Sequence, residues 1–126
     1  MRLNDVYQFF QDSCPTAINK ELAVCYVLSV LTQKESYGTE LMQIIKREYP
    51  TYRLSETILY RAFAFLERIG AVSCRKQRTS GKGRPRHIYK LLPEWREQAE
   101  ELSELWHAYV RGDYRGEQAP RFEYSH

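Results

Sequence analysis

The most distinctive chemistry in this sequence is a run of basic side chains between two β-like segments. The stretch RKQRTSGKGRPRHIYKL, residues 75–91, holds seven Lys and Arg residues and no Asp or Glu. Guanidinium and ammonium groups bind phosphate oxygens, whereas a merely solvated surface usually mixes both signs of charge. The run therefore indicates a polyanionic partner. Its candidate phosphate ligands are Arg75, Lys76, Arg78, Lys82, Arg84 and Arg86.

The charge outside this segment is balanced or acidic. Residues 1–70 carry eight bases and eight acids, residues 71–92 carry seven bases and no acid, and residues 93–126 carry four bases and eight acids. The net charge of +3 therefore conceals one concentrated basic segment. With 126 residues, of which 43% are hydrophobic, the chain can build one domain with a buried core.

A second set of candidate residues lies on a helix predicted between Ser55 and Gly70. Ser55 is a good N-cap, and Gly70 stands where a helix often ends in a left-handed residue. The side chains expected to be buried are Ile58, Leu59, Ala62, Phe63, Leu66 and Ile69. The opposite face carries Thr57, Tyr60 and Arg61 near the N-terminal end, where a solvated surface is the alternative interpretation. These three can hydrogen-bond base edges or phosphates, and Ser55 with the helix N-terminus can bind a phosphate.

Other chemistry finds little support in the sequence. The cysteines, Cys14, Cys25 and Cys74, are odd in number and far apart, so we expect neither a disulfide framework nor a metal site. We expect Cys25 and Cys74 to be small buried side chains. The histidines are isolated, and there is no Gly-rich phosphate loop or Gly-x-Ser-x-Gly motif. We therefore expect a cytoplasmic protein without catalytic residues, cofactor, metal or membrane span.

Helical periodicity predicts three further helices before the Ser55 helix. Leu3, Val6, Tyr7 and Phe10 share one face, which predicts a short helix over residues 2–12. A second helix is expected to begin after Asn19 and to end near Thr32; because it is apolar nearly all round, it should be central to the core. The third helix is expected to be capped by Ser36 and to end before Pro50.

The basic run itself is predicted to be a β-hairpin. The segment AVSCRKQR alternates as a strand, TSGKG is rich in turn residues, and RHIYKLL returns as a second strand. We expect Val72 and Cys74 to share one face of the first strand and Tyr89 and Leu91 to share one face of the second. The positive charge is then concentrated around the tip of the hairpin.

A final helix is expected to begin at Pro93. Apolar residues recur along it with spacings of 4, 3, 4 and 3, which is typical of a coiled-coil seam. We favour a subunit interface for this seam, with packing on its own domain as the alternative. The seam residues are Trp95, Ala99, Leu102, Trp106 and Tyr109.

This order of elements is that of a winged helix-turn-helix, in a mainly α (α+β) fold. The expected units are an N-terminal helix (1–14), the DNA-binding domain (15–92), a C-terminal dimerisation helix (93–112) and a flexible tail (113–126). In such a fold the third core helix enters the DNA major groove and the hairpin, or wing, follows the phosphates. Double-stranded DNA is therefore the expected partner.

Three motifs resemble the PadR family of transcriptional regulators. YGTEL is similar to that family's HGYEL, SETILYRAFAFLERIGAV to S-P-x-T-L-Y-R-A-L-x-x-L-E-x-x-G-L-V, and GRPRHIYKLLPEWREQ to G-x-P-R-R-x-Y-x-L-T-x-E-G. The resemblance covers about residues 20–100. It departs at Tyr37, which replaces a histidine, at Glu56, which replaces a proline, and at the additional N-terminal helix.

The resemblance implies a homodimeric repressor that is dimerised through the C-terminal helix and binds a pseudo-palindromic operator. Some relatives respond to small molecules, and Trp95, Trp106 and Tyr109 could line such a groove, although packing is the commoner role of aromatics at this spacing. Two alternatives to sequence-specific binding stay open. One is a winged helix that binds only proteins, and the other is a nonspecific nucleic-acid binder.

Overall fold

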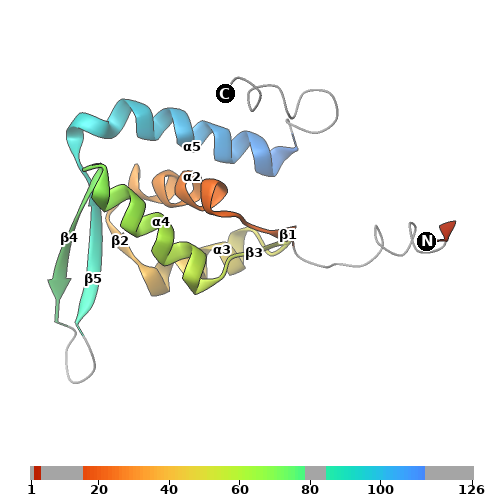
Figure 1. Cartoon of the computed structure of the whole chain (residues 1–126), viewed down its shortest axis with the longest axis horizontal. Coiled ribbons are helices and arrows are strands. Elements are labelled where there is room, and N and C mark those ends of the chain that lie inside the picture. The colour runs from red at the N-terminus through yellow and green to blue at the C-terminus, as the bar shows by residue number, and fades with distance from the viewer. Residues whose placement is uncertain (1, 4–15, 79–84, 113–126) are drawn as a thin grey trace.

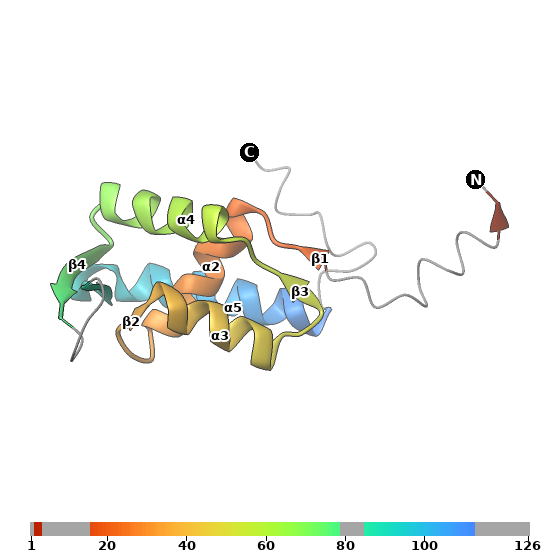
Figure 2. The ribbon, with the colours of Figure 1, turned by 90° about the horizontal axis from the view of Figure 1, so that it is seen from below.

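The computed structural model describes residues 2–3, 16–78 and 85–112. Within them, helices pack around α2, and a β-hairpin projects from one end (Figure 1). In Figure 2, α4 and α3 flank α2 on opposite sides. The elements in chain order are β1 (Thr16–Ala17), α2 (Lys20–Leu31), β2 (Ser36–Tyr37), α3 (Gly38–Glu48), β3 (Tyr52–Arg53), α4 (Glu56–Arg68), β4 (Val72–Gln77), β5 (Arg86–Leu91), the 3-10 helix η1 (Pro93–Trp95) and α5 (Arg96–Arg111).

Side-chain caps begin α2 and α4 where the sequence predicts them. The Asn19 Oδ1 accepts a hydrogen bond from the Leu22 amide at 2.8 Å, and the Ser55 Oγ accepts one from the Ile58 amide at 3.1 Å. Each bond satisfies an amide that has no partner within its helix. Gly70 follows α4 with a φ of 83°, so its expected left-handed conformation is confirmed.

The third helix begins later than expected, because Ser36 belongs to a strand. The extended backbone of β2 pairs Ser36 with Tyr89 and Tyr37 with Ile88. Tyr37 is therefore the N-cap of α3, and its side chain makes no capping hydrogen bond. The prediction that Ser36 caps this helix is wrong; its hydroxyl donates instead to Glu40 Oε1 at 2.6 Å.

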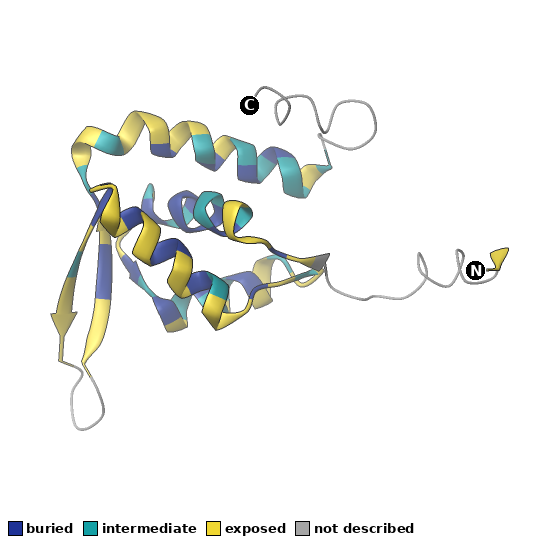
Figure 3. Ribbon diagram, viewed as in Figure 1, coloured by how far each residue is buried: buried dark blue, intermediate teal, exposed yellow. Residues whose placement is uncertain are grey.

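The predicted hairpin is confirmed, and it forms part of a three-stranded antiparallel sheet in the order β2-β5-β4. Its register pairs Val72 with Leu91 and Cys74 with Tyr89. A short parallel bridge joins β1 to β3, and no pattern in the sequence predicted it. Figure 3 shows that burial is concentrated near the base of the hairpin, whereas its outer part is exposed. The sheet therefore anchors the wing on the helical core and leaves its far end to solvent.

The C-terminal helix belongs to the core of its own chain. Trp106 on α5 is fully buried, with its ring centroid 5.2 Å from those of Tyr26 and Tyr49. Ala99 is also buried. The expectation that the whole seam faces a second subunit is therefore wrong for Ala99 and Trp106, because α2 and its neighbours cover them. The other seam residues, Trp95, Leu102 and Tyr109, are half-buried.

Two expectations about individual side chains also differ from the structure. Ile69, expected in the buried stripe of α4, is 36% exposed, because α4 ends at Arg68 and Ile69 is its C-cap. Cys25 and Cys74 are free and only half-buried. Several predictions lie outside the described residues: the helix over 2–12, Cys14, the hairpin tip with Lys82 and Arg84, and the tail over 113–126.

Candidate nucleic-acid interface

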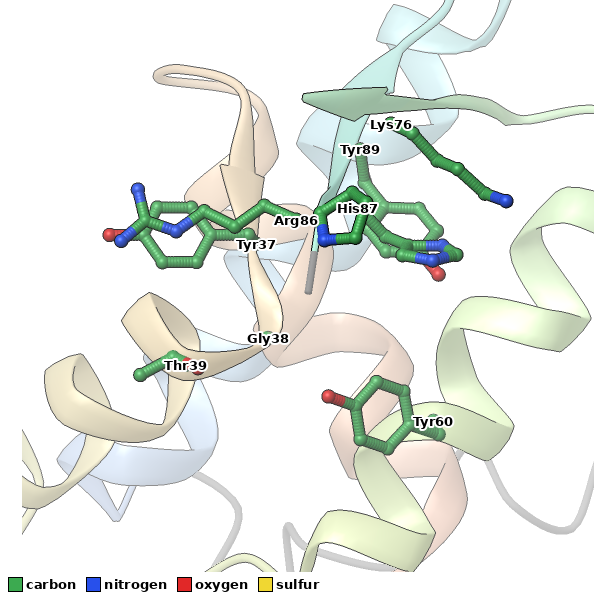
Figure 4. Close-up of a pocket in the computed structure, with 9 residues that line it drawn as sticks. Tyr37, Gly38, Thr39, Tyr60, Lys76, Arg86, His87 and Tyr89 are labelled. Carbon is green, nitrogen blue, oxygen red and sulfur yellow. The ribbon is translucent and has the colours of Figure 1, made fainter. Parts of the chain in front are cut away.

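A cleft of about 710 Å³ separates α4 from the hairpin, and residues from five elements line it (Figure 4). Its walls come from β2, the first turn of α3, the outer side of α4 and both strands of the hairpin. Segments far apart in the sequence therefore meet at one surface. The lining residues are Tyr37, Gly38, Thr39, Tyr60, Lys76, Pro85, Arg86, His87 and Tyr89.

An aromatic ring positions one of the wing cations. The Arg86 guanidinium carbon lies 4.2 Å from the centroid of the Tyr37 ring, which is a cation–π contact between β5 and β2. Figure 4 shows the guanidinium beside that ring. Arg86 remains exposed, as does Lys76 on the neighbouring strand. The contact limits the conformations of Arg86 without neutralising its charge.

The back of the cleft is a packed aromatic pair. Tyr89 on β5 stacks on Phe63 of α4 with ring centroids 3.7 Å apart and planes 5° apart. Burial raises the pKa of Tyr89, and the neighbouring Cys74 raises it further. This stack connects the hairpin to α4 and fixes the two walls of the cleft relative to each other.

Tyr60 and Arg61 point into different grooves. Tyr60 is 50% exposed and points from α4 toward the first turn of α3 (Figure 4). Arg61 lies about 100° further around the helix and lines a second groove on the other side of α4. Thr57, one turn before these two residues on α4, is also exposed. The three side chains expected to read DNA are thus all accessible, but they do not form one cluster.

The second groove, of about 690 Å³, lies between α2, α4 and α5. Its rim is basic and its floor is largely apolar; Phe65 is 37% exposed there, and burial raises the pKa of the Cys25 thiol to about 11. The lining residues are Lys20, Glu21, Val24, Cys25, Arg61, Ala62, Ala64, Phe65, Arg68 and Leu102.

Arg75 differs from the other wing cations because it is paired. Its two terminal nitrogens donate to the carboxylate oxygens of Glu35 at 2.9 and 2.8 Å. This hydrogen bonding lowers the pKa of Glu35 and raises that of Arg75. Arg75, a candidate phosphate ligand in the sequence, is therefore already paired within the protein. Within the described part of the wing, Lys76, Arg78 and Arg86 are exposed cations without a carboxylate partner.

Part of the cleft consists of residues that no sequence pattern predicted as a site. Tyr37, Gly38 and Thr39 were known only as part of the YGTEL motif, and their position opposite Tyr60 depends on the unpredicted strand β2. His87 was regarded as isolated, yet its Nδ1 lies 3.6 Å from the Cys74 Sγ on the paired strand.

The described residues contain no group of three or more His, Cys, Asp or Glu side chains suited to a metal ion. They also contain no helix long and apolar enough to cross a membrane.

Comparison with known proteins identifies the family. Residues 27–101 match the transcriptional regulator PadR-like family. The chain belongs to the PadR-like family. This confirms the resemblance in the three motifs, and PadR-like proteins are transcriptional regulators rather than enzymes. No curated protein gives a significant match.

Two solved structures share this fold over nearly the whole chain. The circadian clock associated protein Pex from Anabaena is 49% identical with a TM-score of 0.77, over 90% of this chain and 98% of that one. Pex from Synechococcus is 45% identical with a TM-score of 0.75, over 87% of this chain and 98% of that one. The chain length, the helix expected over residues 2–12 and the single C-terminal helix predict this likeness to Pex, and the two matches confirm the likeness.

A more distant likeness concerns the fold alone. Bacillus subtilis PadR, solved in complex with operator DNA, is 16% identical with a TM-score of 0.55. The match covers 62% of this chain and 44% of that one.

Proposed function

We propose that this chain is a sequence-specific DNA-binding regulator that acts in the cytoplasm as a homodimeric repressor. The observation that carries the proposal is the cleft between α4 and the wing. There the exposed Tyr60 side chain of α4 lies across from Lys76 and Arg86, two exposed cations of the hairpin. Helix and wing can then contact the base edges and the backbone of one duplex together.

The outward face of α4 supplies the groups that distinguish bases. Thr57 and Tyr60 can donate or accept hydrogen bonds, and Arg61 can donate to a guanine or to a phosphate. Ser55 is occupied by its own helix, since its Oγ accepts from the Ile58 amide. Because Ser55 lies at the N-terminus of α4, its hydroxyl proton can still be donated to a phosphate oxygen there.

The wing supplies affinity. Lys76, Arg78 and Arg86 are exposed cations that can neutralise phosphates, and Lys82 and Arg84 add two more charges in the sequence between the strands. Counterion release makes such binding strongly dependent on salt. Arg75 contributes less in this proposal, because Glu35 already balances its charge. Bacillus subtilis PadR, which shares the fold, was solved on its operator, and this supports DNA as the ligand.

The homodimer is supported by apolar surface that the single chain leaves open. Phe65 and Ile69 are more than one-third exposed at the end of α4, beside the half-buried Trp95 and Leu102 on or next to α5. Isolated exposed apolar residues need no explanation, but a contiguous patch commonly marks an interface. A dimer would read a pseudo-palindromic site with half-sites about 34–36 Å apart. In this proposal α5 both completes the core and carries the subunit contact.

The regulated process is proposed from the likeness to Pex. Two structures of Pex match nearly the whole of this chain, and the Anabaena protein is described as associated with the circadian clock. We extend that role to this chain and propose a circadian clock gene as its target.

The proposal is tested by separating specific from nonspecific affinity. Tyr60→Ala removes a reading group from the cleft without changing charge. We expect it to lower the ratio of operator to random-duplex affinity by about fivefold to 100-fold, the range of one good base contact. Fluorescence anisotropy with the two duplexes measures the ratio. An unchanged ratio would show that α4 does not read sequence through this residue.

A further inference from the structure

One contact in the cleft has the geometry of a positioning device. Gly38, the first residue of α3, is buried beneath the ring of Tyr60. A methyl group placed on Gly38 would stand 2.7 Å from the Tyr60 hydroxyl oxygen and 3.3 Å from Cζ. Carbon and oxygen atoms that are not bonded do not approach to 2.7 Å. The hydroxyl therefore occupies the space that any side chain at position 38 would need.

The backbone gives no other reason for a glycine here. Among the described residues, only Gly70 and Gly112 have a positive φ, so an alanine at position 38 meets no conformational strain. The obstacle to a larger residue is the far end of one half-exposed side chain, which can rotate into solvent. Alanine at position 38 would therefore leave the fold intact and move the Tyr60 ring.

We propose that Gly38 is a specificity-determining residue that acts through Tyr60. Its missing side chain leaves a notch in α3, and the notch receives the Tyr60 hydroxyl and fixes the ring across the cleft. Phe63 supports the ring from behind, with centroids 6.0 Å apart. The Tyr60 side chain is 50% exposed, so its hydroxyl can donate a hydrogen bond to a ligand or accept one from it. This inference rests on the proposed function, since it takes DNA as that ligand.

The consequence is that the residue at position 38 determines which base α4 can recognise through Tyr60. A hydroxyl held in one place loses less entropy on binding than one that rotates freely. It also cannot move to meet a base whose donors and acceptors lie elsewhere, so the fixed position favours one base over the others. The α3 residue would then control a base contact made from α4, without touching DNA itself.

A double-mutant cycle on the full-length protein tests the inference. The four proteins are the wild type, Gly38→Ala, Tyr60→Phe and the double variant, which keeps the ring but lacks the oxygen that clashes. We expect Gly38→Ala to lower the ratio of operator to random-duplex affinity about fivefold to tenfold, as for the loss of one hydrogen bond. In the Tyr60→Phe background the same substitution should change the ratio less than twofold.

Two measurements on the free protein separate this inference from the proposed function. The melting temperature of Gly38→Ala should be unchanged or higher, because alanine restricts the unfolded chain. The ¹³C ring resonances of Tyr60, assigned by their loss in Tyr60→Phe, should shift in Gly38→Ala. Resonances that stay in place, or an equal loss of specificity in both backgrounds, would overturn the positioning role. If the resonances shift while even the wild type binds no duplex specifically, the notch stands and the proposed function fails.

Discussion

Arg86→Gln and Arg75→Gln remove the same charge from the same hairpin, yet we expect different effects on DNA binding. Arg86 lines the cleft, with its guanidinium over the Tyr37 ring, and among the described residues no carboxylate forms a salt bridge with it. Arg75 is bound through two hydrogen bonds to Glu35. The pair of variants therefore separates a direct phosphate contact from a change in net charge.

The size of the effect follows from counterion release. Each phosphate contact contributes about 0.9 to the slope of log affinity against log salt, so Arg86→Gln should reduce the slope by about 0.9 per subunit and about 1.8 per dimer. Between 50 and 200 mM salt, a slope change of 1.8 alters the relative affinity of wild type and variant about 12-fold. For Arg75→Gln the change should be much smaller, because Glu35 has already displaced the counterion.

Fluorescence anisotropy titrations of one labelled duplex at four or more salt concentrations give the slope of log affinity against log salt for the wild type and for each variant. A third variant, Arg75→Gln with Glu35→Gln, removes the whole ion pair at constant net charge and should retain the wild-type slope. Equal reductions of the slope for Arg86→Gln and Arg75→Gln would show that only the overall charge of the hairpin matters, and that Arg86 makes no direct phosphate contact.

Two predictions concern stability. Trp106→Ala should lower the free energy of unfolding by about 3–5 kcal/mol at every protein concentration, because the chain itself buries this ring. Urea denaturation checks it, and a loss that disappeared on dilution would place Trp106 at a subunit interface. Burial raises the pKa of Glu40, but hydrogen bonds from Lys34 and Ser36 outweigh this effect and hold the pKa of the carboxyl below its usual value. This carboxylate therefore stabilises the fold above the unfolded pKa, and its contribution is lost as pH falls through the lower folded value. The melting temperature of Glu40→Gln should accordingly fall less between pH 6 and pH 3 than that of the wild type, and identical pH profiles would contradict this.

Local signals in the sequence account for much of the fold. Ser55 and Gly70 marked the ends of α4, because capping and left-handed glycine are properties of a few adjacent residues. The hairpin strands followed from alternation and from the turn residues between them. The family could be inferred from motifs that combine these signals, and the comparisons confirmed it.

The features that sequence analysis missed depend on contacts between distant segments. Strand β2 has only two residues, and its partner β5 lies about fifty residues away, so no periodicity reveals it. Glu35 and Arg75 are 40 residues apart in the sequence and meet only because the sheet brings them together. Trp106 was predicted to face a second subunit, but its own chain buries it. Apolar residues at spacings of three and four predict a buried helix face, and they do not indicate which chain covers that face.

Selecting bound duplexes from a random pool at about 150 mM salt tests most directly whether this winged helix reads DNA sequence. We predict a palindromic consensus whose half-sites lie about one helical turn apart. Salt-sensitive binding that enriches no sequence would contradict it and leave a wing that only holds phosphates. No binding at any salt concentration would contradict it as well and would favour a protein partner.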